Sequence, residues 1–220
     1  MGVIEPSFPW LHWLHHASFR IESALGVIYI DPYKLKSSMP ADYIFVTHAH
    51  MDHFSPADIK KISKTGTLLI CPEKVAKKAK DISVLEVEPG MAFEAGAIRG
   101  RAVPSYNRRK PLHPRSHGNT GFILDLPEGR VYHAGDTDFI EEMATPDFKG
   151  IDVALLPTGK AFFFRPTMGP EQAAEAVRAM DPRFAVPMHY GTLPGSKKDG
   201  AAFKTAVGDK TALLQEEEPI

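Results

Sequence analysis

The chain has 220 residues, of which 43% are hydrophobic and 24% charged, and its formal net charge at pH 7 is −1. This composition is typical of a globular protein and gives no overall basic field of the kind that attracts nucleic acid. No stretch approaches the roughly 20 apolar residues that cross a bilayer, and the N-terminus lacks the pattern of a signal peptide. The single cysteine, Cys71, excludes an internal disulfide and is better interpreted as a small buried side chain than as a reactive thiol. We therefore expect a soluble, cytoplasmic protein.

Short apolar runs separated by turns predict strands and helices along the whole chain. Ser55 and Pro56 have the residue types of a helix N-cap and first position, which predicts a helix through about Lys64. A short basic helix is predicted over residues 73–80, and apolar residues at helical spacing predict another over 170–180. The predicted strands cover residues 18–22, 27–30, 43–46, 67–71, 84–87, 97–103, 121–126, 130–133, 152–156 and 184–188.

No flexible linker and no repeat of fixed period divides the chain, so we expect one domain over residues 1–220. Strands mixed with a few helices in both halves indicate sheets whose outer faces are covered by helices. The acidic segment 216–219 is expected to be a solvated tail.

The strongest signal for function is a cluster of histidines directly after the predicted strand 43–46. His48, His50, Asp52 and His53 fall within six residues, and imidazole and carboxylate groups are typical ligands of zinc and related metals. On a turn, His48 and His50 can face one point while Asp52 and His53 face a second point nearby. This arrangement predicts two adjacent metal ions, which lie roughly 3.5–4 Å apart in two-metal sites. A chance cluster is the weaker interpretation, because only 10 of the 220 residues are histidine.

Further ligands are expected at the ends of other predicted strands. Asp136 follows Gly135, a residue type that permits a sharp turn, and its carboxylate is placed to bridge both ions. An aspartate that only caps its own turn is the alternative for Asp136. His189 ends the predicted strand 184–188 as His48 follows its own strand, which makes it a natural last ligand.

The loop-like segment 106–118 contains two more histidines, His113 and His117. One of them should complete the first metal site with the histidines of the cluster, and we favour His113. Four basic residues lie in the same segment: Arg108, Arg109, Lys110 and Arg115. They either recognise an anionic group such as phosphate or form a solvated basic loop.

These ordered motifs resemble the metallo-β-lactamase superfamily. The matching residues are His-x-His-x-Asp-His at 48–53, Gly-Asp at 135–136, and His189. Segments 16–22, 30–32 and 167–173 resemble one branch of it, which includes relatives of L-ascorbate-6-phosphate lactonase and of N-acyl phosphatidylethanolamine phospholipase D. The resemblance covers residues from about 10 to about 215. It is highly specific for fold and metal binding and weakly specific for substrate.

The resemblance implies an α/β (α+β) fold, a four-layer αββα sandwich with the site at one edge between the sheets. It also implies a ligand set: His48, His50 and a third histidine for one ion, Asp52, His53 and His189 for the other, and Asp136 as the bridge. The chain departs from the pattern at residues 105–107, where many relatives carry the third histidine, so this ligand has to come from the loop beyond. His16 and Asp31 are expected to orient ligands through hydrogen bonds, with a core histidine as the alternative for His16.

The expected chemistry is hydrolysis by a water that the ions activate, since a bound metal lowers the pKa of water to about 7. The expected substrate is a small molecule, an ester, lactone or phosphodiester, with an anionic group if the basic loop recognises one. Asp52 would orient the nucleophile as well as bind metal, Tyr190 would contact the substrate, and His133 or Tyr190 would assist the leaving group. Zinc is the default ion for such ligands, and manganese, iron or nickel occupy similar sites.

The alternative is redox chemistry at a di-iron centre on the same scaffold. Relatives of that kind carry glutamate where this chain has His50, and usually a flavin domain for which this length leaves no room. RNA-processing relatives carry an inserted domain, and no comparable insertion fits here, so no nucleic-acid partner is expected. No membrane partner is expected either, because no apolar stretch is long enough to cross a bilayer. The segment 162–165, Phe-Phe-Phe-Arg, either walls a substrate pocket or packs in the core.

Overall fold

The computed structural model describes residues 8–36, 39–159, 166–192 and 198–217. Its strands form two mixed six-stranded sheets, and in both the spatial order follows the order in the chain. The first sheet contains β1 (Leu11–His15), β2 (Ser18–Ser23), β3 (Gly26–Ile30), β4 (Ala41–Phe45), β5 (Ser63–Cys71) and β6 (Ser83–Glu86). The second contains β7 (Ala92–Ala95), β8 (Ile98–Pro104), β9 (Thr120–Leu126), β10 (Gly129–His133), β11 (Val153–Pro157) and β12 (Phe184–Met188).

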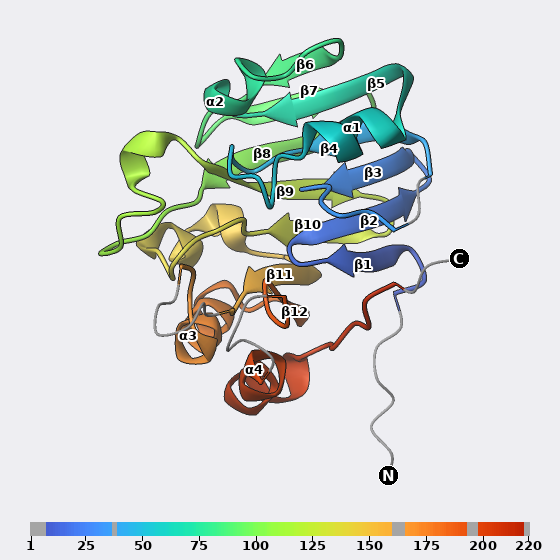
Figure 1. Ribbon diagram of the computed structural model, residues 1–220. Helices are drawn as coiled ribbons and strands as arrows, with labels where there is room; N and C mark the ends of the chain where they lie inside the picture. Colours follow the sequence, from blue (N-terminus) through green and yellow to red (C-terminus); the bar gives the residue numbers. More distant parts are fainter. Residues whose placement is uncertain (1–7, 37–38, 160–165, 193–197, 218–220) are drawn as a thin grey trace.

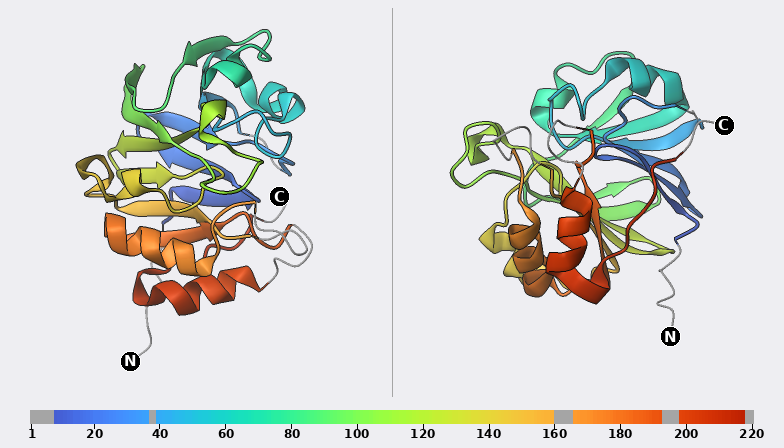
Figure 2. Two further views of the ribbon diagram at one scale, coloured as in Figure 1. Left: turned by 90° about the vertical axis from the view of Figure 1, so that its left-hand side faces the viewer. Right: turned by 60° about the horizontal axis from the view of Figure 1, so that its bottom comes forward.

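Helices cover the outer faces of this pair of sheets. The α-helices are α1 (Pro56–Ile62), α2 (Glu73–Ala76), α3 (Pro170–Met180) and α4 (Asp199–Val207). The short 3-10 helices are η1 (Arg115–His117), η2 (Glu141–Ala144), η3 (Pro146–Phe148) and η4 (Gly208–Lys210). Figures 1 and 2 show the two sheets face to face, with α1 and α2 outside the first and α3 and α4 against the second. The predicted αββα sandwich is therefore confirmed.

The main hydrophobic core lies between the two sheets. Phe45 of the first sheet and Phe122 of the second are fully buried, and their rings meet edge to face with centroids 5.1 Å apart. A second core lies between the first sheet and its helices, where Ile59 and Ile62 of α1 pack with Leu69 of β5. Strands β9, β11 and β12 bury nearly all of their residues, which explains why short apolar runs predicted them.

The carboxyl ends of strands from both sheets meet at one edge. β3 and β4 are parallel neighbours, and so are β10, β11 and β12, so the chain leaves each of these strands on the same side. The amide of Thr120 at the start of β9 donates a 3.0 Å hydrogen bond to the carbonyl of Thr47 after β4, which joins the two sheets there. Ligand sites in open α/β sheets form at such edges.

Some elements differ from those predicted. Ser55 caps α1, since its Oγ accepts a 3.3 Å hydrogen bond from the amide of Asp58, but the helix ends at Ile62 because β5 starts at once. α2 is shorter than predicted: it ends at Ala76, and Val75 is its buried residue. β1, β7 and α4 were not predicted; β7 is an edge strand of only four residues, although its burial alternates.

The prediction of a solvated acidic tail is wrong for its first residues. The carboxylate of Glu217 accepts 3.0 and 2.8 Å hydrogen bonds from Arg20, and Glu216 lies 3.1 Å from both His15 Nδ1 and Lys36 Nζ. The chain here pairs with β1 through a bridge to Trp13. Residues 218 and 219 lie outside the described part of the chain.

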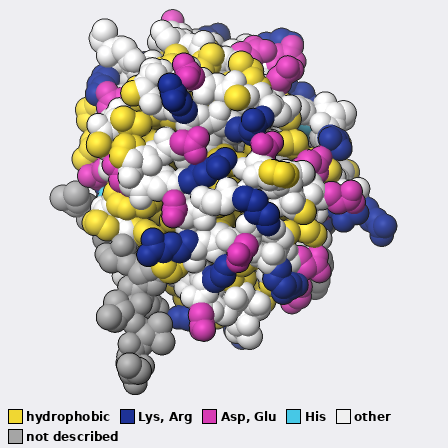
Figure 3. Space-filling model, turned by 180° about the vertical axis from the view of Figure 1, so that it is seen from behind, with side chains coloured by type: hydrophobic (Ala, Val, Ile, Leu, Met, Phe, Trp, Pro, Cys, Tyr) yellow, Lys and Arg dark blue, Asp and Glu magenta, His cyan; other side chains and the backbone are white. Residues whose placement is uncertain are grey.

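The face seen from behind carries basic and acidic side chains interspersed (Figure 3). Ion pairs join residues of β7 to β10: Arg99 lies 3.1 Å from Glu94, and Arg130 lies 3.3 Å from Asp125. Cys71 is fully buried, and burial raises the pKa of its thiol to about 12, as expected for a packed side chain. In the described ranges, no helix is long and apolar enough to span a membrane.

Candidate metal centre

The histidine cluster of the sequence occupies a tight turn between β4 and α1. The amides of His53 and Phe54 both donate to the carbonyl of His50, at 3.1 and 2.8 Å. This turn exposes His50 and buries His48 and His53. The imidazoles of His48 and His53 are tilted against each other with centroids 4.1 Å apart. The turn contributes to two groups of neighbouring ligand atoms, with His48 and His50 in one and Asp52 and His53 in the other.

One group of side chains, which we call the histidine subsite, consists of His48, His50 and His113. One nitrogen from each lies within 4.8 Å of the others. His50 Nδ1 lies 3.1 Å from His48 Nε2 and 3.1 Å from His113 Nε2. His117, the alternative to His113, is partly exposed at the end of η1 and lies outside this group.

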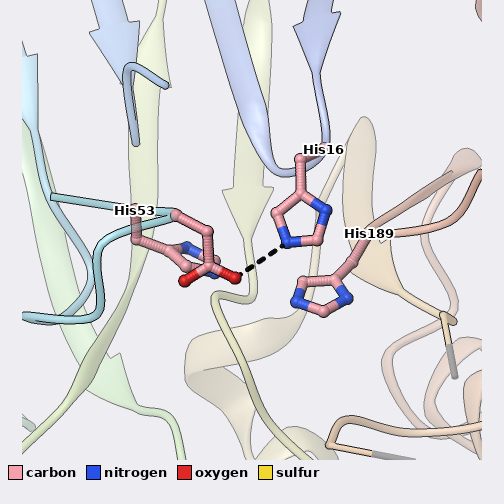
Figure 4. Close-up of side chains that lie close together, drawn as sticks. His16, His53 and His189 are labelled. Atoms are coloured by element: carbon pink, nitrogen blue, oxygen red, sulfur yellow. Dashed lines mark ion pairs between the residues drawn. The ribbon is translucent and has the colours of Figure 1, made fainter. Parts of the chain in front are cut away.

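A second group, which we call the mixed subsite, consists of His16, Asp52, His53 and His189, again with ligand atoms within 4.8 Å of one another. Its members come from the β1–β2 turn, the turn after β4 and the end of β12. Figure 4 shows the imidazoles of His16, His53 and His189 turned toward one space. His16 was expected to stand behind the ligands, but its Nε2 lies within the cluster, 3.3 Å from Asp52 Oδ2.

The carboxylate of Asp136 lies between the two subsites. Its Oδ1 is 3.3 Å from His53 Nε2, and its Oδ2 is 3.2 Å from His189 Nε2. The same Oδ2 is 3.4 Å from His113 Nε2 and 4.0 Å from His48 Nε2. Gly135 before it has a φ of +62°, and an added Cβ there would lie 3.1 Å from Thr47, so glycine suits both the turn and the space.

Hydrogen bonds from outside the cluster orient several imidazoles. His53 Nδ1 lies 2.7 Å from Asp31 Oδ2, and the carboxylate of Asp31 also accepts from the amide and hydroxyl of Thr47, both at 2.7 Å. His113 Nδ1 lies 2.9 Å from Asn107 Oδ1. Such partners fix the tautomer and orientation of a metal-binding histidine. Asn107 was not singled out in the sequence, although it lies in the segment 105–107 where the resemblance implies a third histidine in relatives.

Backbone conformation holds the mixed subsite. His16, Asp31 and His189 all have positive φ, at 54°, 47° and 63°, a conformation uncommon for non-glycine residues that clusters at functional sites. A Cβ added to Gly159 would lie 1.6 Å from the carbonyl oxygen of His189, so only glycine permits this close approach of the two segments. The position of His189 therefore depends on tightly packed backbone.

Several buried polar atoms of the cluster lack hydrogen-bond partners within the described residues. They are His16 Nε2, His53 Nε2, both ring nitrogens of His189, and Asp136 Oδ1. Unpaired buried polar atoms are costly and call for an explanation such as a bound ion. Their convergence fits divalent metal ions.

Electrostatics give the cluster the protonation states that metal binding needs. Burial lowers the pKa of His48 and His113, and lowers that of His16 to about 4, so these imidazoles are neutral near pH 7. Burial raises the pKa of Asp136, but the imidazoles of His189 and His53 outweigh it and hold that pKa well below its ordinary value.

His53 differs from the other buried imidazoles. Burial lowers its pKa, but the carboxylates of Asp136 and Asp31 outweigh this effect and raise the pKa well above its ordinary value. In the absence of an ion, a proton on His53 partly balances the charge of these two buried carboxylates, and a metal ion would displace it.

The basic loop is largely neutralised. Arg108 lies 3.5 Å from Glu141, Arg115 lies 3.0 Å from Glu142, and Lys110 pairs with Asp138. Arg109 is exposed and, among the residues described, has no ion pair.

Two other residues, Tyr190 and His133, were predicted to act on the substrate. Tyr190 stacks on Trp13 with ring centroids 5.1 Å apart. His133 is fully buried, with Nε2 donating to the carbonyl of Ala17 at 2.9 Å and Nδ1 accepting from the amide of Gly135. The suggestion that His133 assists the leaving group is therefore wrong. The segment 162–165 lies outside the described residues.

Comparison with solved structures shows which folds resemble this one. A candidate metal-dependent hydrolase from Parabacteroides distasonis has a TM-score of 0.80 and 31% identity, covering 94% of this chain and 93% of that one. Igni18, a metallo hydrolase from Ignicoccus hospitalis, has a TM-score of 0.71 and 26% identity, covering 95% and 94%. The di-iron β-hydroxylase CmlA from Streptomyces venezuelae shares the fold at 16% identity and a TM-score of 0.73, and the match covers 94% of this chain and 52% of that one.

Comparison of sequences identifies the family. Residues 10–189 match the family model described as the β-lactamase superfamily domain. A UPF0173 metal-dependent hydrolase from Pyrobaculum islandicum is 36% identical over 211 residues, which are 90% of this chain and 91% of that protein. The chain therefore belongs to the UPF0173 metal-dependent hydrolases of the β-lactamase superfamily.

Proposed function

We propose that this hydrolase works through two divalent metal ions, one in the histidine subsite and one in the mixed subsite. The observation that carries the proposal is the position of Asp136, whose two oxygens face imidazoles of both subsites at 3.2 to 3.4 Å. Carboxylates bridge ions in this way, and separations of roughly 3.5–4 Å suit two-metal hydrolysis. The orphaned polar atoms of the mixed subsite and of Asp136 support the assignment of an ion there.

In such a centre the ions lower the pKa of a water molecule and polarise the bond under attack. The protein supplies the geometry. Asp31 and Asn107 hold the imidazoles of His53 and His113 in the orientation that binds metal. Asp52 is partly exposed and lies in the mixed subsite, where its carboxylate would bind the metal and orient the nucleophile. His50 is the exposed member of the histidine subsite, which leaves the centre accessible from that side.

We propose a small ester, lactone or phosphodiester as the substrate, since all three have an electrophilic centre that a metal-activated water attacks. An anionic group would be recognised by Arg109, because Arg108, Lys110 and Arg115 have carboxylate partners. The donor set of histidine and aspartate suits Zn²⁺, and Mn²⁺, Fe²⁺ or Ni²⁺ bind similar ligands.

The fold shared with CmlA keeps a di-iron oxidoreductase as the second candidate. Hydrolysis is favoured because His50 completes an all-histidine subsite, where the resemblance predicts glutamate in the redox proteins. Oxygen consumption by the iron-loaded protein in the presence of a reductant would favour the second candidate.

The test is to measure metal content and hydrolysis together. Purified protein loaded with Zn²⁺ or Mn²⁺ is analysed for metal content and assayed against a phosphodiester, a lactone and an ester. We expect two ions per chain and hydrolysis of at least one substrate class, with loss of turnover in His50→Ala but retention of the fold. A single ion per chain at saturation, or full turnover in His50→Ala, would contradict the proposal.

A further inference from the structure

His16 lies at the two-residue turn between β1 and β2, outside the segments expected to supply metal ligands. Its side chain is 1% exposed, and its Nε2 points into the mixed subsite. The ring stands 3.8 Å from that of His189, centroid to centroid, with an interplanar angle of 43°. A hairpin from the N-terminal end of the chain therefore brings an imidazole to the same space as the loops after β4 and β12 (Figure 4).

The approach of His16 to Asp52 does not have the geometry of a hydrogen bond. Hydrogen bonds between imidazole and carboxylate are short, roughly 2.7–2.9 Å when charged, as His53 Nδ1 and Asp31 Oδ2 are at 2.7 Å. His16 Nε2 and Asp52 Oδ2 are 3.3 Å apart, and this nitrogen has no hydrogen-bond partner within the described residues. Two atoms that bind one ion at right angles, each about 2.1 Å from it, lie about 3.0 Å apart. The observed spacing is closer to that of neighbouring ligands.

The ring nitrogen of His16 that points away from the cluster has a hydrogen-bond partner, as in the other candidate ligands. His16 Nδ1 lies 2.5 Å from Thr192 Oγ1, as His53 Nδ1 is held by Asp31 and His113 Nδ1 by Asn107. In each case one ring nitrogen is fixed by a partner outside the cluster, and Nε2 points into it. This is the usual arrangement of histidines that bind metal.

The backbone of His16 also positions the mixed subsite. Its carbonyl accepts hydrogen bonds from the amide of His189 and from Trp13 Nε1, both at 2.9 Å. Its φ of 54° is a conformation that is uncommon for histidine and persists where the surroundings enforce it. The same residue thus fixes the place of His189 and presents its own nitrogen beside it.

We propose that His16 is itself a ligand of the ion in the mixed subsite. This inference rests on the proposed two-metal centre and adds a ligand to it. With Asp136, the mixed subsite then offers five side chains to its ion, and the histidine subsite offers four. A higher coordination number suits Mn²⁺, Fe²⁺ or Ni²⁺, whereas four-coordinate Zn²⁺ suits the histidine subsite. The two positions should therefore differ in metal preference.

Nuclear magnetic resonance of protein loaded with ¹¹³Cd²⁺ and labelled with ¹⁵N-histidine tests the proposal without any activity assay. Each nitrogen bound to the ion is split by coupling to ¹¹³Cd. We expect split signals from His16, His53 and His189 in the mixed subsite, besides the three of the histidine subsite. His16→Asn should remove one split signal, and asparagine tolerates the positive φ at this position. His15→Asn, on the neighbouring residue, is the matched control and should leave all six unchanged.

Affinity gives a second measurement. In competition with a chelator, His16→Asn should weaken one of two bound Cd²⁺ ions by at least about 100-fold, and Thr192→Ala by roughly 10- to 100-fold, as loss of an outer partner does. If His16→Asn does not fold, as judged by near-ultraviolet circular dichroism without metal, the wild-type spectrum decides alone. An unsplit His16 Nε2 that carries a proton while two ions are bound would overturn the proposal and make His16 a hydrogen-bonding residue. Wild-type protein that binds fewer than two ions would instead contradict the two-metal centre itself.

Discussion

The two subsites of the candidate centre are built by different means. The histidine subsite takes His48 and His50 from one turn and His113 from a long loop, and Asn107 holds His113 through a side-chain hydrogen bond. The mixed subsite is buried more deeply and depends on backbone, with positive φ at His16 and His189. One half is therefore open to solvent at His50, and the other is enclosed and held by its backbone. We expect the ion of the mixed subsite to bind more tightly and exchange more slowly.

The largest effect is expected from removing the group that joins the two halves. Asp136→Ala should abolish binding of at least one ion and lower kcat/KM by roughly 1,000-fold or more, because the pKa of the attacking water returns toward about 15.7. The fold should persist, since the side chain contacts only the cluster among described residues. Metal analysis and circular dichroism of the same sample provide the measurement.

Asp138→Asn is the control for this change. Asp138 lies on the same loop and is equally buried, but its carboxylate faces Lys110 and the amide of Arg108. The asparagine keeps the hydrogen bond from the amide and should keep both ions. Equal loss of metal in the two variants would mean that the loop, rather than the bridging carboxylate, determines metal binding.

Acid should destabilise the metal-free protein through both halves of the centre. The pKa of His16 falls from 6.5 to about 4 and those of His48 and His113 are also lowered, so below pH 6.5 the unfolded chain binds protons that the folded chain does not. The free energy of unfolding therefore falls as pH drops from 6.5, by roughly 3 kcal/mol by pH 4 from His16 alone.

His53 does not offset this loss. Its pKa is raised, so the stability that it contributes is complete below 6.5 and is lost only as pH rises through its folded pKa. Urea unfolding of the chelator-treated protein between pH 4 and pH 8 measures the effect. A stability that is constant from pH 7 to pH 4.5 would show that these imidazoles are not buried in the neutral form.

A smaller effect, confined to one half, is expected from Asn107→Ala. The imidazole of His113 would lose the partner that fixes its tautomer. Such a loss lowers metal affinity by roughly 10- to 100-fold. Only the histidine subsite should weaken, so metal titration should show one ion bound as in the wild type and one bound less tightly. Asn119→Ala, at another buried asparagine of the same loop, is the control. Equal weakening of both ions would contradict the independence of the two halves.

The difference between the halves also explains what the sequence revealed. The turn after β4 was recognised because its ligand types are adjacent in the chain, and most strands were recognised as short apolar runs between turns. The roles of Asn107 and Thr192 depend on contacts between segments, to residues 6 and 176 positions away, so no local pattern indicated them. The same holds for His16, which the sequence placed near the site but not in it, because the direction of its ring follows from a positive φ and from Thr192.

The smallest effect is expected at the rim of the open half. Arg109 is exposed on the loop that supplies His113 and, in the described part of the chain, has no carboxylate partner. If it recognises an anionic substrate, Arg109→Ala should raise KM for a phosphodiester by up to about 10-fold with little change in kcat. Exposed charges contribute roughly 0.2–1 kcal/mol each and are screened by salt, so the effect should shrink at high ionic strength.

A neutral ester provides the comparison substrate, and Arg108→Ala provides the comparison variant, because Arg108 already pairs with Glu141 at 3.5 Å. With the neutral ester, Arg109→Ala should not change KM in a salt-dependent way, because the substrate has no charge. Arg108→Ala should not do so with the phosphodiester, because Glu141 already neutralises this cation. A rise in KM that is equal for both substrates and insensitive to salt would mean that Arg109 shapes the loop around His113. The open half would then recognise its substrate by shape and not by charge.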